Sequence, residues 1–160
     1  MEELAIDSVT LDEGQARVSI SGVPDIPGVA AKVFDEVAAA GIFVDMIVQS
    51  HNGHAGQASL SFTVPNAKLA DSAAVADRLA ATFQCREVTS SPDIAKLSVS
   101  GVGLRSHTGV AIRAFNALAK AGINVEIINT SEVRVNVVVD GKSAKQALAE
   151  LQNAFSDVLQ

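Results

Sequence analysis

The hydrophobic pattern of this chain switches repeatedly between a period of two residues and a period of three to four. Apolar and polar residues alternate in four segments, 16–20, 58–64, 97–99 and 133–139. Such alternation predicts half-buried β-strands with one face on the core. Shorter apolar runs at 44–48 and 125–128 predict a further strand in each half of the chain.

Four helices are predicted between these strands. Two apolar stripes of helical spacing precede Gly41 and Gly122, which have the position of helix-ending glycines. The stripes are Val29, Val33 and Val37 in the first case and Ala111, Phe115 and Leu118 in the second. Two later stripes predict second helices, and they consist of Leu69, Ala73, Ala76, Leu79 and Phe83, and of Ala144, Leu148, Leu151 and Phe155.

The chain contains two copies of one unit. The tripeptide 21–23 (SGV) recurs at 100–102, and the segment 28–47 recurs with changes at 109–128. The offset between the copies rises from 79 to 81 residues between these two matches, so the second copy has two extra residues in the loop before its first helix. Repeats of this kind indicate duplicated structural modules.

The order of the elements predicts the α+β class, with two ferredoxin-like βαββαβ modules in tandem. The first module is expected at 13–92, with its fourth strand at about 86–89. The second module, 93–160, has only five residues after Phe155, which is too few to leave a helix and cross a sheet. We therefore expect the N-terminal strand, 4–12, to complete the sheet of the second module.

Composition and charge exclude several classes of function. The formal net charge is −6 and Lys and Arg are not clustered, so the sequence predicts no basic surface that could bind nucleic acid. No apolar run reaches membrane-spanning length, and the acidic N-terminus does not resemble a signal peptide, so we expect no membrane partner and a cytoplasmic location. The single cysteine, Cys85, excludes an internal disulfide and is expected to be a small buried residue.

Three motifs resemble a known family. They are Asp25-Ile26-Pro27-Gly28, Ser106-His107-Thr108-Gly109 and Ile128-Asn129-Thr130-Ser131-Glu132-Val133. In this order they resemble the regulatory subunit, or C-terminal regulatory region, of aspartate kinase, which is built from two ACT domains. The resemblance covers essentially the whole chain. It implies a non-catalytic sensor for feedback inhibition by threonine, lysine or both, without catalytic residues, metal or cofactor.

The same resemblance implies partners. It predicts an aspartate kinase catalytic chain, and a homodimer formed through the ACT domains. Two alternatives remain, a free-standing ACT sensor that serves another enzyme or a transport system, and a small enzyme with the same fold. The sequence leaves open whether the chain is a separate subunit or a fragment of a longer kinase.

The loop at Asp25 has the chemistry to bind an amino acid. The first amides of the following helix lack intrahelical partners and can bind a carboxylate, while the Asp25 carboxylate can receive an ammonium group. An Asp-x-Pro-Gly sequence is also an ordinary turn and helix-start signal, with Pro27 suited to a helix start. By resemblance, the effector-binding positions are Asp25, Ile26, Pro27, Gly28, Val29 and Ala30, together with Gln49, Asn124 and Val125 on second strands of adjacent modules.

A second effector site is possible at the equivalent positions of the other copy. These are Ser106, His107, Thr108, Gly109 and Val110, with Phe43, Val44, Asp45 and Ser131. The copy departs from the family pattern, because Phe43 replaces the usual Asn and Thr108 replaces the usual Pro. Since a Phe cannot hydrogen-bond an effector, we expect Phe43 to be core or pocket wall, and the two sites to be unequal. Asp45 could hold a cationic effector side chain, although a solvated strand face also explains it.

Rival chemistries are weaker. His51 and His54 suggest a metal, but the Asn52-Gly53 turn explains this loop, and the sequence places no third ligand. Gly101, Gly103 and Gly109 break the spacing of a dinucleotide-binding loop.

Overall fold

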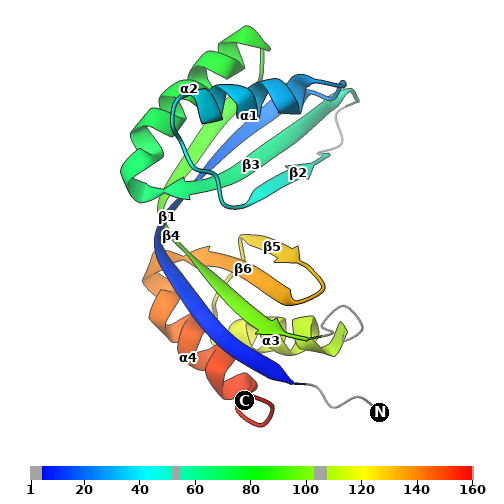
Figure 1. Ribbon diagram of the computed structural model, residues 1–160, viewed down its shortest axis with the longest axis vertical. Helices are drawn as coiled ribbons and strands as arrows, with labels where there is room; N and C mark the ends of the chain where they lie inside the picture. The colour runs from blue at the N-terminus through cyan, green and yellow to red at the C-terminus, as the bar shows by residue number, and fades with distance from the viewer. Residues whose placement is uncertain (1–4, 52–54, 103–107, 160) are drawn as a thin grey trace. The chain divides into compact units, whose positions relative to one another are not determined.

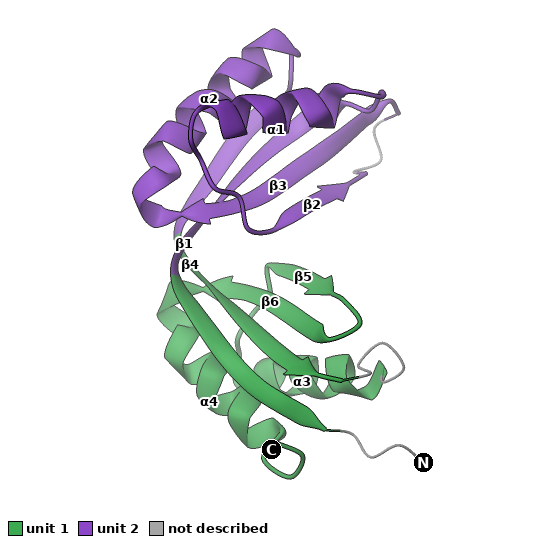
Figure 2. Cartoon of the chain, in the orientation of Figure 1, with its two compact units in different colours: residues 1–13, 93–160 green, residues 14–92 purple. Residues whose placement is uncertain are grey.

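The computed structural model describes residues 5–51, 55–102 and 108–159. The chain forms two compact units, which Figure 2 shows in different colours. Unit 2 is Gly14–Pro92, and unit 1 consists of Met1–Glu13 and Asp93–Gln160. Each unit is a layer of helices on one face of a sheet (Figure 1).

Unit 2 contains the first copy of the repeat. Its elements are the C-terminal part of β1 (Ile6–Pro24), α1 (Val29–Ala39), β2 (Ile47–Ser50), β3 (Gln57–Pro65), the short 3₁₀ helix η1 (Asn66–Lys68), α2 (Leu69–Thr82) and the first residues of β4 (Glu87–Gly101). The strand order is β2-β3-β1-β4. Strands β1 and β3 are antiparallel, and so are β2 and β3.

The core of unit 2 forms where the alternating strand residues meet the helical stripe. Opposite positions of β1 and β3 pair as Val18 with Phe62 and Ile20 with Leu60, and all four side chains are buried. The α1 stripe of Val29, Val33 and Val37 lies on this layer as the sequence predicts. On α1, Phe34 meets Phe62 edge to face, with 5.7 Å between the ring centroids.

Unit 1 contains the second copy and the N-terminus. Its elements are the rest of β4, α3 (Thr108–Lys120), β5 (Ile127–Thr130), β6 (Arg134–Asp140), η3 (Gly141–Ser143), α4 (Ala144–Ala154) and the first residues of β1. The strand order is β1-β4-β6-β5, with β4 and β5 each antiparallel to β6.

The N-terminal strand completes the sheet of unit 1, as the sequence predicts. Ile6 is fully buried, and Ile6 and Val9 belong to the same hydrophobic core as Leu97, Leu151 and Phe155. The residues after α4 form a turn instead of a fourth strand. The amide of Ile6 donates to the carbonyl of Val158 over 3.0 Å, which ties the turn to the start of β1.

Strands β1 and β4 each pass from one unit into the other. The sequence predicts separate strands at 4–12 and 16–20, and likewise at 86–89 and 97–99, whereas each pair belongs to one continuous strand in the structure. Gly14 and Asp93, at the two crossings, have positive φ angles of 81° and 54°. The predicted α+β class with two ferredoxin-like βαββαβ modules is confirmed.

Other elements differ from the prediction in their limits or faces. The strands β2 and β5 begin three and two residues later than expected. On α3 the buried stripe is Val110, Ala114 and Leu118, whereas Phe115 is half-buried. Apolar residues at adjacent positions of a helix allow two stripes, and packing against the sheet selects one of them.

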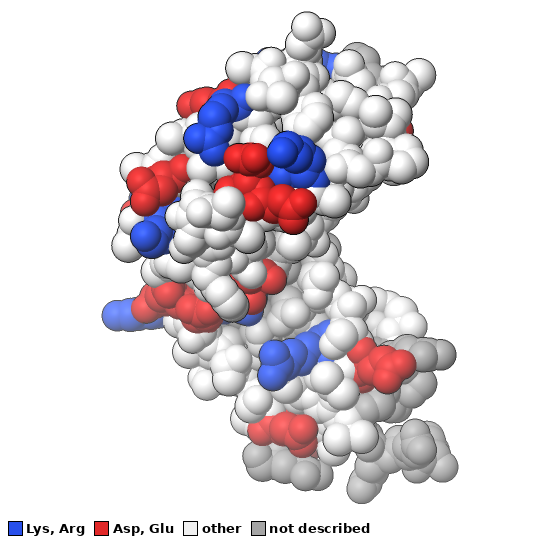
Figure 3. All heavy atoms as spheres, turned by 45° about the horizontal axis from the view of Figure 1, so that its top comes forward, with Lys and Arg blue, Asp and Glu red and all other residues white. Residues whose placement is uncertain are grey.

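Charges of both signs are interspersed on the face shown in Figure 3, without a broad patch of one sign among the described residues. On unit 2, Glu36 pairs with Lys32 at 3.3 Å and with Arg78 at 3.2 Å. None of the helices in the described part of the chain is long and apolar enough to cross a membrane.

Candidate functional site

The loop 25–28 joins β1 to α1 and presents the first turn of that helix. Gly28 precedes α1 with a φ of 94°, so the chain turns sharply before Val29, where the helix begins. The sequence places the helix start at Pro27, whereas α1 begins two residues later, at Val29. Gly28 has a left-handed conformation that costs other residues energy, because their Cβ meets the neighbouring backbone. The amide of Val29 donates to the carbonyl of Ile26 over 3.4 Å, so the amides without an intrahelical partner at this end of α1 are those that follow Val29.

The β2–β3 hairpin holds Asp25 at both its backbone and its side chain. The Asp25 amide donates to the carbonyl of Gly56 over 2.8 Å. The Asp25 Oδ2 lies 2.8 Å from His51 Nε2, at the end of β2. Because a carboxylate only accepts hydrogen bonds, the imidazole nitrogen is the donor. From sequence, His51 is expected only as a possible metal ligand, and nothing in the sequence indicates this contact with Asp25.

A small cavity of about 30 Å³ lies against this loop. Its lining residues are Val23, Pro24, Asp25, Ile26, Ala30, Gln49, Ala58 and Leu60. The structure thus brings together four of the predicted positions, Asp25, Ile26, Ala30 and Gln49. Gln49 reaches the cavity because it pairs with Leu60 on the neighbouring strand, so both side chains share one face of the sheet. Ile26 is 62% exposed, so the cavity is open toward solvent at this residue.

Asn124 and Val125 lie in unit 1, between α3 and β5. Asn124 is exposed, and Val125 is half-buried against the core of that unit. The Asn124 amide side chain is thus accessible for hydrogen bonding. Whether it meets the Asp25 loop of another module stays a prediction.

The positions of the possible second site have a different local structure. Ser106 and His107 lie outside the described residues. Helix α3 begins at Thr108, so Gly109 is within the helix, unlike its counterpart Gly28. Ser131 belongs to the β5–β6 turn, where its hydroxyl accepts a bond of 3.4 Å from the amide of Val133.

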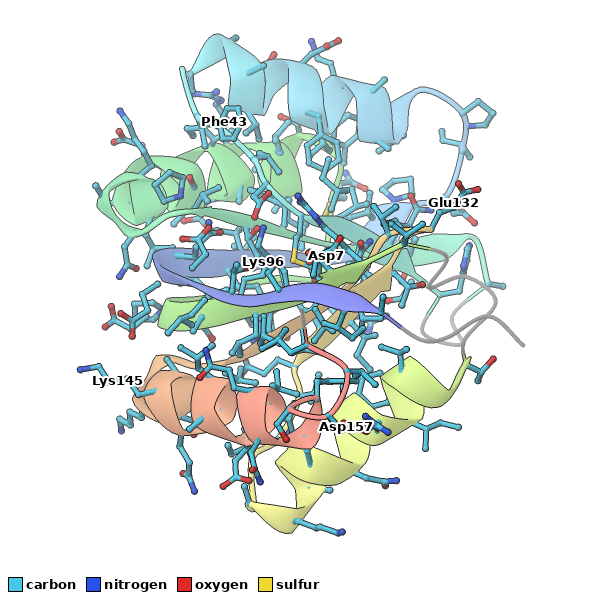
Figure 4. All side chains as sticks on the ribbon, turned by 60° about the horizontal axis from the view of Figure 1, so that its bottom comes forward. Asp7, Phe43, Lys96, Glu132, Lys145 and Asp157 are labelled. Atoms are coloured by element: carbon cyan, nitrogen blue, oxygen red, sulfur yellow. The ribbon has the colours of Figure 1, made fainter. Side chains whose placement is uncertain are left out.

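Phe43 does not belong to the core, and that part of the prediction is wrong. Its exposed fraction is 76%, and Figure 4 labels it on the segment between α1 and β2. The following residue, Val44, is half-buried and packs on the core of unit 2, so the chain points Phe43 outward. Asp45 is exposed. The role of Phe43 as a pocket wall stays a prediction.

Other candidate chemistry is limited. Among the described residues, no three His, Cys, Asp or Glu side chains form a possible metal cluster, and His54 and the Asn52-Gly53 turn lie outside those residues. Cys85 is half-buried against the core of unit 2, and burial raises the pKa of its thiol. A raised thiol pKa disfavours the reactive thiolate.

A larger open groove of about 480 Å³ runs between α3 and α4. It shares only Gly109 with the predicted positions. Its Arg113 bonds Asp157 over 2.9 Å and lies over the Phe155 ring, which gives this cation a structural role in unit 1. Of the two hollows, we regard the smaller one at Asp25 as the candidate site, because it combines an acid, an amide and a helix N-terminus.

Comparison with known proteins identifies the type of module. The model of the ACT-domain family matches residues 18–78 and 97–155. The chain is 41% identical over 155 residues to the aspartate kinase Ask_LysC of Stutzerimonas stutzeri, and 40% identical over 152 residues to an aspartokinase of Thermus thermophilus. These matches cover 97% and 94% of the chain. The chain spans only 37% of the length of these two curated relatives.

Solved structures give a closer match in length. The regulatory subunit of aspartate kinase from Thermus flavus has 39% identity and a TM-score of 0.87, and the match covers 95% of this chain and 99% of that one. The ligand-free regulatory subunit from Thermus thermophilus has 39% identity and a TM-score of 0.86, with the same coverage.

The different conformations of Gly28 and Gly109 lead to a testable difference in stability. Gly28→Ala should lower the free energy of unfolding by about 1–2 kcal/mol, because alanine must adopt a left-handed conformation there. Gly109→Ala should be neutral, or stabilising by up to about 1 kcal/mol, because this residue is helical and a Cβ meets nothing within 4 Å. Urea denaturation followed by circular dichroism measures both values. Equal effects of the two substitutions would contradict the assigned geometry.

Proposed function

The chain belongs to the family of aspartate kinase regulatory subunits built from ACT domains, and from this premise we propose that it binds threonine, lysine or both and thereby inhibits an aspartate kinase catalytic chain. The observation that supports this function best is the cavity at α1, where Asp25 and Gln49 lie beside the amide end of a helix. The chain itself carries the regulatory part of the kinase and not its catalytic domain. The cytoplasmic location expected from the sequence belongs to the same proposal.

The cavity offers complementary groups for the backbone of an amino acid. The Asp25 carboxylate is suited to the α-ammonium, and the first amides of α1 are suited to the α-carboxylate. Gln49 can exchange hydrogen bonds with an effector side chain, since an amide both donates and accepts. This set recognises any small amino acid, so the choice between threonine and lysine depends on further groups.

The size of the cavity indicates that unit 2 does not form the whole site. A cavity of about 30 Å³ has room for only a few water molecules, which is less than an amino acid requires. We propose that a neighbouring module of a dimer completes the site with its Asn124 and Val125. The exposed Asn124 side chain supplies a hydrogen-bonding group without cost to the core of unit 1.

The dimer is supported by the edges of the sheets. Strands β2 and β5 are edge strands of the sheets in their units. Their residues Ile47 and Ile128 are each 50% exposed. Edge strands with exposed apolar residues favour pairing with another chain. We therefore expect a homodimer in which such edges meet.

Light scattering at micromolar concentration should give twice the mass of the 16.5 kDa chain. Replacing Ile47 with Lys should shift the equilibrium toward monomer, because a charge on an edge strand opposes pairing. Lys32→Arg, a surface change on the helix layer of the same unit, serves as the control. A monomer in the unmodified protein, with and without amino acids, would rule out the dimer.

Removing the proposed ammonium partner should weaken effector binding. Asp25→Ala should raise the dissociation constant for threonine or lysine at least tenfold, since losing a charged hydrogen-bond partner costs about 2 kcal/mol. Isothermal titration calorimetry measures the affinity, and Asp77→Ala is the matched control on an exposed acid of α2 in the same unit. Unchanged affinity in Asp25→Ala would show that the site is elsewhere. Binding of a different amino acid instead would favour the free-standing sensor.

The two copies should also differ as sensors. Asn124→Ala should weaken effector binding more than Phe43→Asn, because Asn124 offers an amide and Phe43 offers no hydrogen bond. Titration of the dimer should reveal one strong class of site per chain. Two equal sites per chain, both insensitive to Asn124→Ala, would contradict this arrangement.

A further inference from the structure

The contact between His51 and Asp25 joins two positions whose residue types differ between the two copies of the repeat. The offset of 81 residues places Ser106 opposite Asp25 and Glu132 opposite His51. A hydroxyl and a carboxylate therefore replace the acid and the imidazole. The combination of an acid and an imidazole at these two positions is specific to the sequence of the first copy, and the pair of Asp25 and His51 lies at the cavity that we propose as the effector site.

We infer that His51 is a positioning residue of this site, whose imidazole holds the Asp25 carboxylate in the orientation that receives the ammonium group of the effector. The inference rests on the proposed function and adds a residue to it. His51 itself need not contact the effector.

His51 is the residue directly after β2, which ends at Ser50. Gln49, near the end of that strand, lines the cavity. The bond of 2.8 Å between His51 Nε2 and Asp25 Oδ2 places the imidazole beside the same cavity. The same hairpin fixes the Asp25 backbone through the carbonyl of Gly56. Asp25 is therefore held at two points by one hairpin.

The hydrogen bond leaves the carboxylate able to bind a cation. A carboxylate has about four acceptor positions, so one bond from an imidazole does not saturate it. A neutral imidazole that donates one proton also leaves the negative charge in place for an ammonium group. The Asp25 side chain is 39% exposed and that of His51 is 66% exposed, so the bond contributes little to folding. Its effect is then expected in binding, because fixing a rotatable side chain beforehand lowers the entropy lost when the ligand arrives.

A double-mutant cycle tests whether His51 acts through Asp25. Threonine and lysine are titrated by calorimetry into the unmodified protein, His51→Ala, His51→Gln, Asp25→Ala and the double variant His51→Ala with Asp25→Ala. We expect His51→Ala to weaken binding about fivefold, the effect of freeing one side chain. His51→Gln should stay within about twofold of the unmodified protein, because its amide nitrogen can donate to the same oxygen.

The decisive comparison is between the effect of His51→Ala in the unmodified protein and its effect in the Asp25→Ala variant, which lacks the carboxylate. In Asp25→Ala, the further change His51→Ala should have no effect, because nothing remains to be positioned. An equal loss in both backgrounds would overturn the inference and show that His51 acts independently of Asp25. Tighter binding in His51→Ala would also overturn it, since the imidazole would then be a competitor of the ammonium group. Unchanged affinity would have the same consequence.

The outcomes also separate this inference from the proposed function. Binding that is lost with Asp25→Ala but insensitive to His51 leaves the function intact and removes only the role of His51. If the unmodified protein binds neither amino acid, the proposed function is wrong, and the proposed role of His51 is then wrong as well. Thermal unfolding of each variant is the structural control, and the midpoints should agree with that of the unmodified protein, because both side chains are at the surface.

Discussion

The two helices of each unit pack on a four-stranded sheet, and the second repeat does not encode its own fourth strand. The N-terminal residues supply it, so Ile6 and Val9 lie in a core whose other buried members come from residues 95–155. Strands β1 and β4 consequently serve both units. Removing the N-terminal strand would expose the apolar face beside β4, and the energetic cost would fall on the second repeat although the change is in the first residues of the chain.

The same sheet geometry positions the candidate site. Pairing of Gln49 with Leu60 directs the Gln49 side chain to the helix-covered face, and the turn at Gly28 opens the amide end of α1 at that edge. Asp25 joins the two parts, since its backbone and its carboxylate both bond the β2–β3 hairpin. An effector held by the loop and by Gln49 would therefore contact β2, which is the edge strand of the unit. In the proposed homodimer, this would link occupancy of the cavity to the pairing of that edge strand with another chain.

The duplicated sequence has diverged at the positions where a ligand would be recognised, whereas the layers have stayed alike. Both copies keep a helix stripe that packs on alternating strand residues. They differ at the helix starts, where Gly28 precedes α1 but Gly109 is within α3, and after the first helices, where Phe43 corresponds to Asn124. Core positions are constrained by close packing, while the loops tolerate change. Unequal sites in a duplicated protein are the expected outcome of that difference.

The sequence by itself determined the α+β modules, the order of their elements, the transfer of the N-terminal strand and the loop at Asp25, because periodicity, glycine positions and chain length are local properties. Only the tertiary structure decided which stripe of α3 is buried, that Phe43 is exposed, and that β1 and β4 are continuous strands. It also decided that His51 meets Asp25 across 26 positions of sequence. These features depend on which surfaces meet, and a contact between distant residues leaves no periodic signal in the chain.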